Sequence, residues 1–141
     1  MKTIFVLDND STQQDMMSKH LKAMGFEVRS VVSAAEFDSL NEKAFMVILD
    51  EKVENRDGSM QFLKKVAHRM SRVPVVYLMS RPERKSIADA KKLGAFEVIE
   101  KNSAALVNLR TILDKLKSEP QRSGWLSKIF GKKENLPALS V

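Results

Sequence analysis

The sequence predicts a doubly wound α/β fold, in which a five-stranded parallel sheet is covered by helices on both faces. Strand and helix signals alternate five times along the chain. Several of the strand segments are continuously apolar, a pattern typical of strands buried on both faces. The chain has 141 residues, of which 43% are hydrophobic, so it can form one domain with a sizeable core and a short extension.

Three of the predicted strands end at or next to a charged residue that could bind an ion. The apolar runs at 4–7 and 45–49 stop on Asp8 and Asp50, and the run at 96–99 stops one step before Lys101. The fourth strand is entered through Pro74. The predicted strands are residues 3–8, 26–32, 45–50, 73–79 and 96–99.

Capping and glycine signals set the helix boundaries. Thr12 and Ser33 each stand three residues before an acidic side chain, the spacing of a capping box. Gly25 and Gly94 are expected to end helices, and Pro82 suits a first helical turn. The predicted helices begin near residue 12, span 33–41 and 59–70, run from Pro82 to Gly94, and span 104–116.

The first of these helices carries an apolar stripe. Its members recur at the three-to-four-residue spacing of a helix face that packs on a core. We therefore expect this stripe to face the sheet, and we interpret the histidine within it as structural. The stripe consists of Met16, Met17, His20, Leu21 and Met24.

The composition changes from Ser118 onward. Residues 118–124 contain Pro120 and no hydrophobic residue, which indicates a linker. We expect a domain of residues 1–117 and an extension of 118–141 that ends in a short amphipathic basic segment. That segment could dock on its own domain, a second copy, another protein or an anionic membrane surface, or it could be disordered, and we favour docking on protein. Its apolar face is Trp125, Leu126, Ile129 and Phe130.

Composition argues against several classes of protein. The chain has no cysteine, which excludes disulfides and thiolate metal sites. The net charge is +6, but the positive residues are scattered without interleaved aromatic residues, so nucleic acid is not a favoured partner. No stretch approaches the roughly 20 apolar residues of a membrane span, and the N-terminal apolar run is too short for an export signal. We expect a cytoplasmic protein.

Asp8, Asp50 and Lys101 are expected to meet in one cleft. Parallel strands place their carboxyl ends at one edge of the sheet, where open α/β sheets bind ligands. With the strand order 2-1-3-4-5, the strands that end in Asp8 and Asp50 are neighbours, roughly 5 Å apart. Two carboxylates at that separation can share a hard cation such as Mg²⁺, and Lys101 could neutralise an anion bound there.

Four segments resemble the receiver domain of bacterial two-component response regulators. They are IFVLDND at 4–10, VILD at 47–50 followed by Asp57-Gly58, VPVVYL at 73–78 and GAFEVIEK at 94–101. The resemblance covers residues 2–117. It implies a flavodoxin-like (βα)5 fold and a role in two-component signal transduction.

The resemblance also implies roles for individual residues. Asp50 matches the phosphoacceptor, which takes its phosphoryl group from a histidine kinase or a phosphotransfer protein. Asp8 and the main-chain carbonyl of Lys52 match ligands of Mg²⁺, together with Asp50 itself. Lys101 matches the lysine that pairs with the acceptor and then with the phosphoryl group. Such charge neutralisation is the main catalytic contribution in phosphoryl transfer.

Departures from the family pattern include positions 9, 79 and 98. Asn9 stands where a second acid is expected, and as a neutral ligand it should lower the affinity for Mg²⁺. Met79 stands where a hydroxyl residue should follow the phosphoryl group, with Ser80 next to it. Val98 occupies the position of the aromatic switch residue.

Three functions therefore stay open. The favoured one is a stand-alone receiver that is phosphorylated on Asp50 and signals through contacts with an unidentified protein or a second copy of itself. It would be no enzyme beyond slow self-dephosphorylation. The second is a phosphate-independent pseudo-receiver that serves as an interaction module. The third is a haloacid-dehalogenase-like phosphatase with Asp8 as nucleophile and Asp10 as general acid, but its later acidic metal motif is missing.

Overall fold

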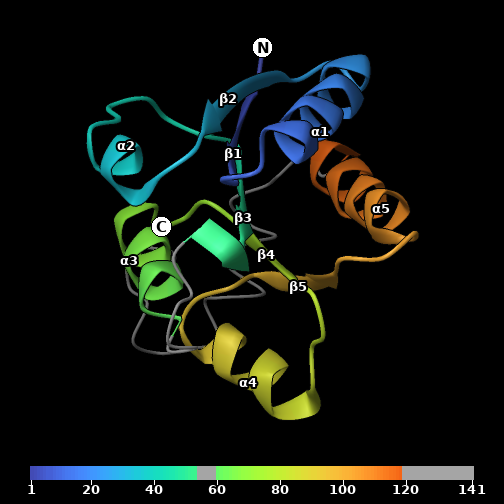
Figure 1. Ribbon diagram of the computed structural model, residues 1–141. Helices are drawn as coiled ribbons and strands as arrows, with labels where there is room; N and C mark the ends of the chain where they lie inside the picture. The colour runs from blue at the N-terminus through green and yellow to red at the C-terminus, as the bar shows by residue number, and fades with distance from the viewer. Residues whose placement is uncertain (54–59, 119–141) are drawn as a thin grey trace. The chain divides into compact units, whose positions relative to one another are not determined.

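The computed structural model describes residues 1–53 and 60–118. Within them the sheet has five strands, all parallel, in the order β2-β1-β3-β4-β5 (Figure 1). The predicted fold class and strand order are confirmed. The strands are β1 (Thr3–Leu7), β2 (Glu27–Val31), β3 (Met46–Asp50), β4 (Val75–Met79) and β5 (Glu97–Glu100).

The described chain forms two compact units. The unit Met1–Asn102 holds the whole sheet and four of the helices. The second unit begins at Ser103 and contains α5 (Ala105–Ser118), whose buried side chains Leu109, Leu113 and Leu116 lie on one helical stripe. The helices of the first unit are α1 (Ser11–Ala23), α2 (Ala34–Asp38), α3 (Gln61–Arg69) and α4 (Arg84–Lys92), with a short 3-10 helix η1 (Glu51–Val53).

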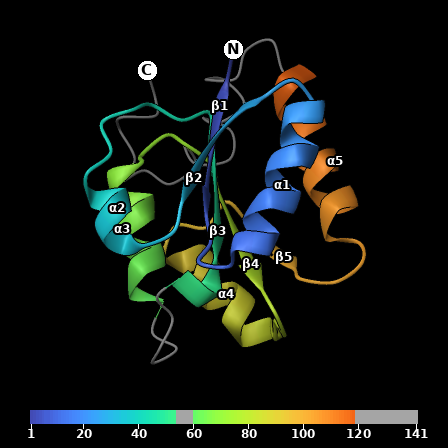
Figure 2. The same ribbon diagram turned by 45° about the horizontal axis from the view of Figure 1, so that its top comes forward.

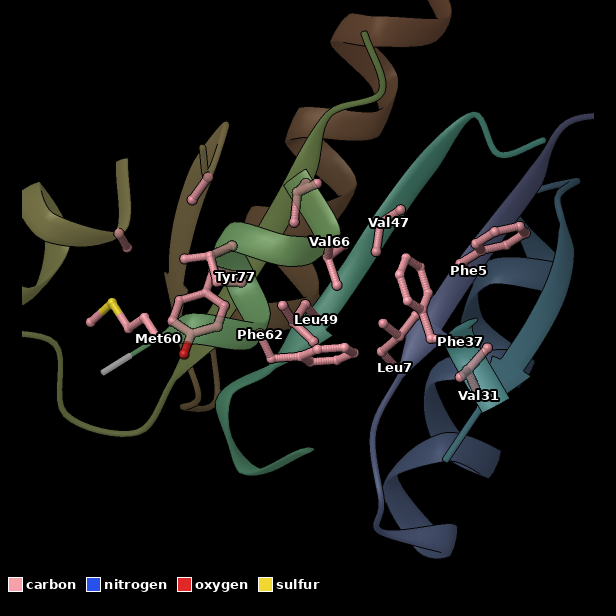
Figure 3. Packing of buried hydrophobic residues seen from close by; sticks show 14 of the residues in the cluster. Phe5, Leu7, Val31, Phe37, Val47, Leu49, Met60, Phe62, Val66 and Tyr77 are labelled. Carbon is pink, nitrogen blue, oxygen red and sulfur yellow. The ribbon is translucent and has the colours of Figure 1, made fainter. Parts of the chain in front are cut away.

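The two faces of the sheet are covered by different helices of the first unit. α1 lies on one face, and α2 and α3 lie side by side on the other (Figures 1 and 2). Figure 3 shows the core beneath α2 and α3, where side chains of alternate strand positions such as Phe5 and Leu49 meet Phe37 and Phe62. Phe37 and Phe62 pack edge to face with ring centroids 5.7 Å apart. This core fixes the strands whose ends carry the predicted site.

The start and the buried face of α1 differ from the prediction. The N-cap is Asp10, whose carboxylate accepts a hydrogen bond from the backbone N–H three residues on, so the predicted cap at Thr12 is wrong. The buried residues of α1 are Gln14 and Leu21, while Met16 is 50% exposed. The predicted stripe therefore misplaces the inner face, because a polar residue occupies its centre.

α4 begins later than predicted. Glu83 is its N-cap and forms a reciprocal capping box with Ser86, so Pro82 lies before the helix. Gly94 follows the helix with φ +116°, and a Cβ atom there would lie 2.4 Å from the Cβ of Ala67 on α3. A glycine is required at this point for both reasons. The Ser33 cap of α2 is as predicted, since its hydroxyl accepts from the N–H of Glu36.

Parts of the predicted extension and of one family segment lie outside the described residues. These are residues 119–141, including the apolar face that contains Trp125, and Asp57-Gly58. No helix among the described residues has the length and apolar character needed to cross a membrane.

Candidate functional site

Asp8, Asp50 and Lys101 stand at the carboxyl edge of the sheet, as expected from the strand order. Asp50 is the last residue of β3, and Asp8 follows Leu7, which pairs with Leu49 of β3. Lys101 follows β5, and its N–H donates to the carbonyl of the last residue of β4. The Lys101 Nζ reaches past β4 and lies 2.8 Å from the Oδ2 of Asp50.

The ion pair between Asp50 and Lys101 is buried. Asp50 is 1% exposed, and the side chain of Lys101 is 13% exposed. The Oδ1 of Asp50 accepts from the N–H of Lys52 at 2.9 Å. Within the described residues, Asp50 Oδ2 and Lys101 Nζ have no hydrogen-bond partner beyond this contact with each other. Both atoms therefore have unused capacity for a further ligand.

Asp8 completes the charged cluster. It is 4% exposed, and its Oδ1 accepts from the N–H of Asp10 at 2.9 Å. Burial raises the pKa of Asp8, the hydrogen bond from Asp10 lowers it, the Asp50 carboxylate raises it and Lys101 lowers it. When ionised, two carboxylates face one ammonium, so the cluster carries one excess negative charge. Such a cluster suits a cation.

Asn9, from the segment between β1 and α1, and Lys52, from η1, lie beside the cluster. The Nδ2 of Asn9 donates to the main-chain carbonyl of Lys52 at 3.1 Å. The two predicted uncharged ligands of Mg²⁺, Asn9 and the carbonyl of Lys52, are thus hydrogen-bonded to each other. The described residues contain no group of three or more acidic, histidine or cysteine side chains that could hold a metal. A cation here would depend on two carboxylates and main-chain oxygen.

Gln14 supports the site and was not predicted. Its Nε2 donates to the main-chain carbonyls of Val6, Asp8 and Val31 at 2.8, 2.9 and 3.0 Å. It is 5% exposed, and its Oε1 has no hydrogen-bond partner among the described residues. Gln14 therefore ties the end of β1 to β2 and to α1. No sequence signal marks it, because a glutamine within a helix is usually at the surface.

Comparison with models of known protein families identifies the family of this chain. Residues 4–114 match the family model of the response regulator receiver domain. The chain belongs to that family. Receiver domains are phosphoacceptors in two-component signal transduction and interact with histidine kinases or phosphotransfer proteins.

One curated relative is the transcriptional regulatory protein TdiR of Thauera aromatica. It is 27% identical over 101 residues, which cover 70% of this chain and 44% of TdiR. The chain thus spans less than half the length of that relative.

Solved structures of low sequence identity share the fold. A two-component response regulator from Clostridium difficile has a TM-score of 0.73 at 17% identity, with 86% of this chain and 100% of that chain covered. A CheY-like receiver domain protein from Methanospirillum hungatei JF-1 has a TM-score of 0.71 at 22% identity, with 83% and 94% covered. A response regulator from Burkholderia pseudomallei, solved with a phosphorylated aspartic acid, a calcium ion and citrate, has a TM-score of 0.66 at 16% identity, with 99% and 89% covered.

The receiver domain departs from the family pattern around β4. Met79 is 5% exposed and belongs to the core, so no hydroxyl stands at that position. β4 pairs regularly with β5 up to Met79, and Ser80 follows as an exposed residue. The N–H of Ser80 donates to the Oε1 of Glu51 at 2.7 Å.

Tyr77 is the aromatic residue of β4. It pairs with Val98 of β5, the position where the family pattern has an aromatic switch residue. The aromatic side chain therefore lies on β4, the strand next to the expected one. Tyr77 is 2% exposed, and Figure 3 shows its ring directed toward Met60. Burial raises the pKa of the Tyr77 phenol, and the charges of Glu51 and Asp50 raise it further. The neutral phenol therefore lies within electrostatic range of both carboxylates.

The phosphatase alternative finds no support in this receiver domain. It needs Asp10 as a general acid, but the Asp10 carboxylate accepts from the N–H of Gln13 and caps α1.

Proposed function

We propose that this receiver domain accepts a phosphoryl group on Asp50. The observation that carries the proposal is the buried carboxylate of Asp50 with the Lys101 ammonium 2.8 Å from its Oδ2. A cation in that place can neutralise the negative charge of an incoming phosphoryl group, and this is the main requirement of phosphoryl transfer.

The proposed transfer uses a phosphohistidine of a histidine kinase or a phosphotransfer protein. A carboxylate oxygen of Asp50 attacks phosphorus, the P–N bond of the donor breaks, and its electron pair returns to the imidazole nitrogen. The product is an acyl phosphate on Asp50. In the resetting step, water attacks phosphorus, the P–O bond to Asp50 breaks, and the carboxylate and inorganic phosphate are released. Slow resetting is the only turnover that we propose.

The residues present suit Mg²⁺ as the cofactor. The excess negative charge of the cluster and the unused capacity of Asp50 Oδ2 favour a hard cation. Asp8, Asp50 and the carbonyl of Lys52 would hold it, and bound Mg²⁺ would supply further neutralisation of phosphoryl oxygens. Asn9 contributes no charge and donates to the carbonyl of Lys52, so we expect a lower affinity than an acid at position 9 would give.

The proposed output is a protein–protein contact. We propose that residues 1–117 form the receiver domain and that the extension of 118–141 docks on a protein, either an unidentified target or a second copy of this chain. The scattered distribution of the positive charges favours protein over nucleic acid.

Intact-mass measurement tests phosphoryl acceptance. The receiver domain is treated with acetyl phosphate and Mg²⁺, and a phosphoryl adduct is expected on the native chain. Asp50→Asn should give no adduct, whereas Asp10→Asn, which changes a capping carboxylate outside the cluster, should retain it. Absence of an adduct on the native chain, with acetyl phosphate and with a phosphorylated histidine donor, would favour the pseudo-receiver.

A further inference from the structure

Glu51 makes an unusual contact next to the proposed phosphoacceptor. It follows Asp50 directly, and its Oε1 accepts a hydrogen bond of 2.7 Å from the N–H of Ser80. Ser80 follows β4, the strand beside β3. A hydrogen bond between an ionised carboxylate and a main-chain N–H is about twice as strong as a neutral one. The contact therefore holds the start of the β4–α4 connection against the end of β3.

The contact lies at the edge of the sheet where a phosphoryl group would be added. Asp50 pairs with Leu78, so Ser80 is only two residues beyond the neighbour of the acceptor. Two residues of extended chain span roughly 7 Å, which is within reach of a phosphoryl group on Asp50. The oxygens of that group would need hydrogen-bond donors, and the N–H of Ser80 is a donor already used by a carboxylate.

We propose that Glu51 is an internal anion that holds the N–H of Ser80 until phosphorylation of Asp50 displaces it. This inference rests on the proposed function. A phosphoryl group repels the Glu51 carboxylate and can take over the same donor. The start of the β4–α4 connection then loses its link to Glu51 and is held by the modified Asp50. Glu51 and the N–H of Ser80 thus replace the switch hydroxyl that Met79 lacks.

The surroundings of Glu51 allow such a displacement. A small cavity is lined by Asp50, Glu51, Met60 and Tyr77. The carboxylates of Asp50 and Glu51 are therefore not closely packed on the side that faces this cavity. Among the described residues, the side chain of Glu51 forms no ion pair with a cation of the cluster, since Lys101 pairs with Asp50. Only its bond to Ser80 opposes its movement among the described contacts.

The test compares the native chain with Glu51→Gln and the matched control Glu100→Gln. Glu100 is an exposed carboxylate at the end of β5, so its loss removes a negative charge from the same edge without touching Ser80. Each chain is titrated with beryllofluoride and Mg²⁺, and binding is followed by the NMR signal of the Ser80 amide. Glutamine keeps the size of glutamate, and thermal melting verifies folding.

We expect Glu51→Gln to bind beryllofluoride about tenfold more tightly than the native chain, since tenfold corresponds to about 1.4 kcal/mol, the difference between a charge-assisted and a neutral hydrogen bond. The Ser80 signal should shift on binding, and Glu100→Gln should stay within about twofold of the native chain. Binding by Glu51→Gln alone would also support the inference.

Equal affinity of Glu51→Gln and the native chain would overturn the role of Glu51 and leave phosphoryl acceptance standing. An equal gain in Glu100→Gln would overturn it too, because general charge would then explain the effect. No binding by any chain would refute phosphoryl acceptance and this inference together.

Discussion

Removal of the Lys101 ammonium should destabilise the fold strongly. In Lys101→Met the Asp50 carboxylate, 1% exposed, loses its only cationic contact among the described residues, with the Asp8 carboxylate nearby. Breaking a buried ion pair by removing one partner costs about 3–5 kcal/mol. Because the Lys101 side chain is 13% exposed and water can reach the gap, we expect the lower end, about 3 kcal/mol.

A double-mutant cycle isolates this effect. Asp50→Asn together with Lys101→Met removes both charges, so the double variant should be more stable than Lys101→Met alone by about 2 kcal/mol. The free energy of unfolding is measured by guanidinium denaturation at pH 7, with the exposed Lys92→Met as control, which should change it by less than about 0.5 kcal/mol. A cost below about 1 kcal/mol for Lys101→Met, or simple additivity in the double variant, would refute the reasoning.

Three further substitutions test other parts of the structure. Burial raises the pKa of Asp8 above 3.8, so ionised Asp8 destabilises the folded state at neutral pH and this cost fades as pH falls toward 3.8. Asp8→Asn should therefore raise the free energy of unfolding at pH 7, with a gain that shrinks in a denaturation series at falling pH, while Mg²⁺ binding measured by calorimetry weakens. Gly94→Ala should cost about 2 kcal/mol or more in thermal melts, from its positive φ and the 2.4 Å approach to Ala67, and an unchanged melting temperature would contradict both causes. Gln14→Leu should cost about 2 kcal/mol in denaturant and weaken beryllofluoride binding, since main-chain carbonyls at the end of β1 lose their donor; unchanged binding would make its role purely structural.

The sequence predicted the strands and their order correctly, but it misplaced the starts of α1 and α4 and the buried face of α1. The strands β1, β3 and β4 are buried on both faces, so their apolar runs are continuous and leave little choice of pattern. Helix starts depend on which of several polar residues reaches the free N–H groups. Near α1, Asp10 and Thr12 compete for that role, and Asp10 makes the bond. The inner face of α1 was misjudged because Gln14 finds three carbonyl partners there, which no spacing of residues indicates.

The meeting of Asp8, Asp50 and Lys101 was predictable for a simple reason. Each stands at or just beyond the end of a strand, and parallel strands bring such positions to one edge. The contact of Glu51 with Ser80 was not predictable in this way. It joins a side chain to a main-chain N–H, and every residue except proline offers that donor. Only the path of the chain after β4 determines which N–H the carboxylate meets.

Side chains at strand ends and main-chain N–H groups differ in how they respond to substitution. A receiver domain can therefore change how it detects a phosphoryl group while it keeps the residues that accept one. In the proposed function, phosphoryl acceptance depends on side chains of fixed type at strand ends, so a change at Asp50 would remove the nucleophile and a change at Lys101 would remove the neutralising charge. Detection of the phosphoryl group needs only a donor whose partner changes, and a main-chain N–H can serve as well as a hydroxyl. In the proposed switch, Met79 can fill the core because the N–H of Ser80 serves as the donor in place of a hydroxyl. On this reasoning, the absence of a hydroxyl at position 79 does not by itself make this chain a pseudo-receiver. The chain would become a pseudo-receiver if the N–H of Ser80 lost the partner that a phosphoryl group can displace.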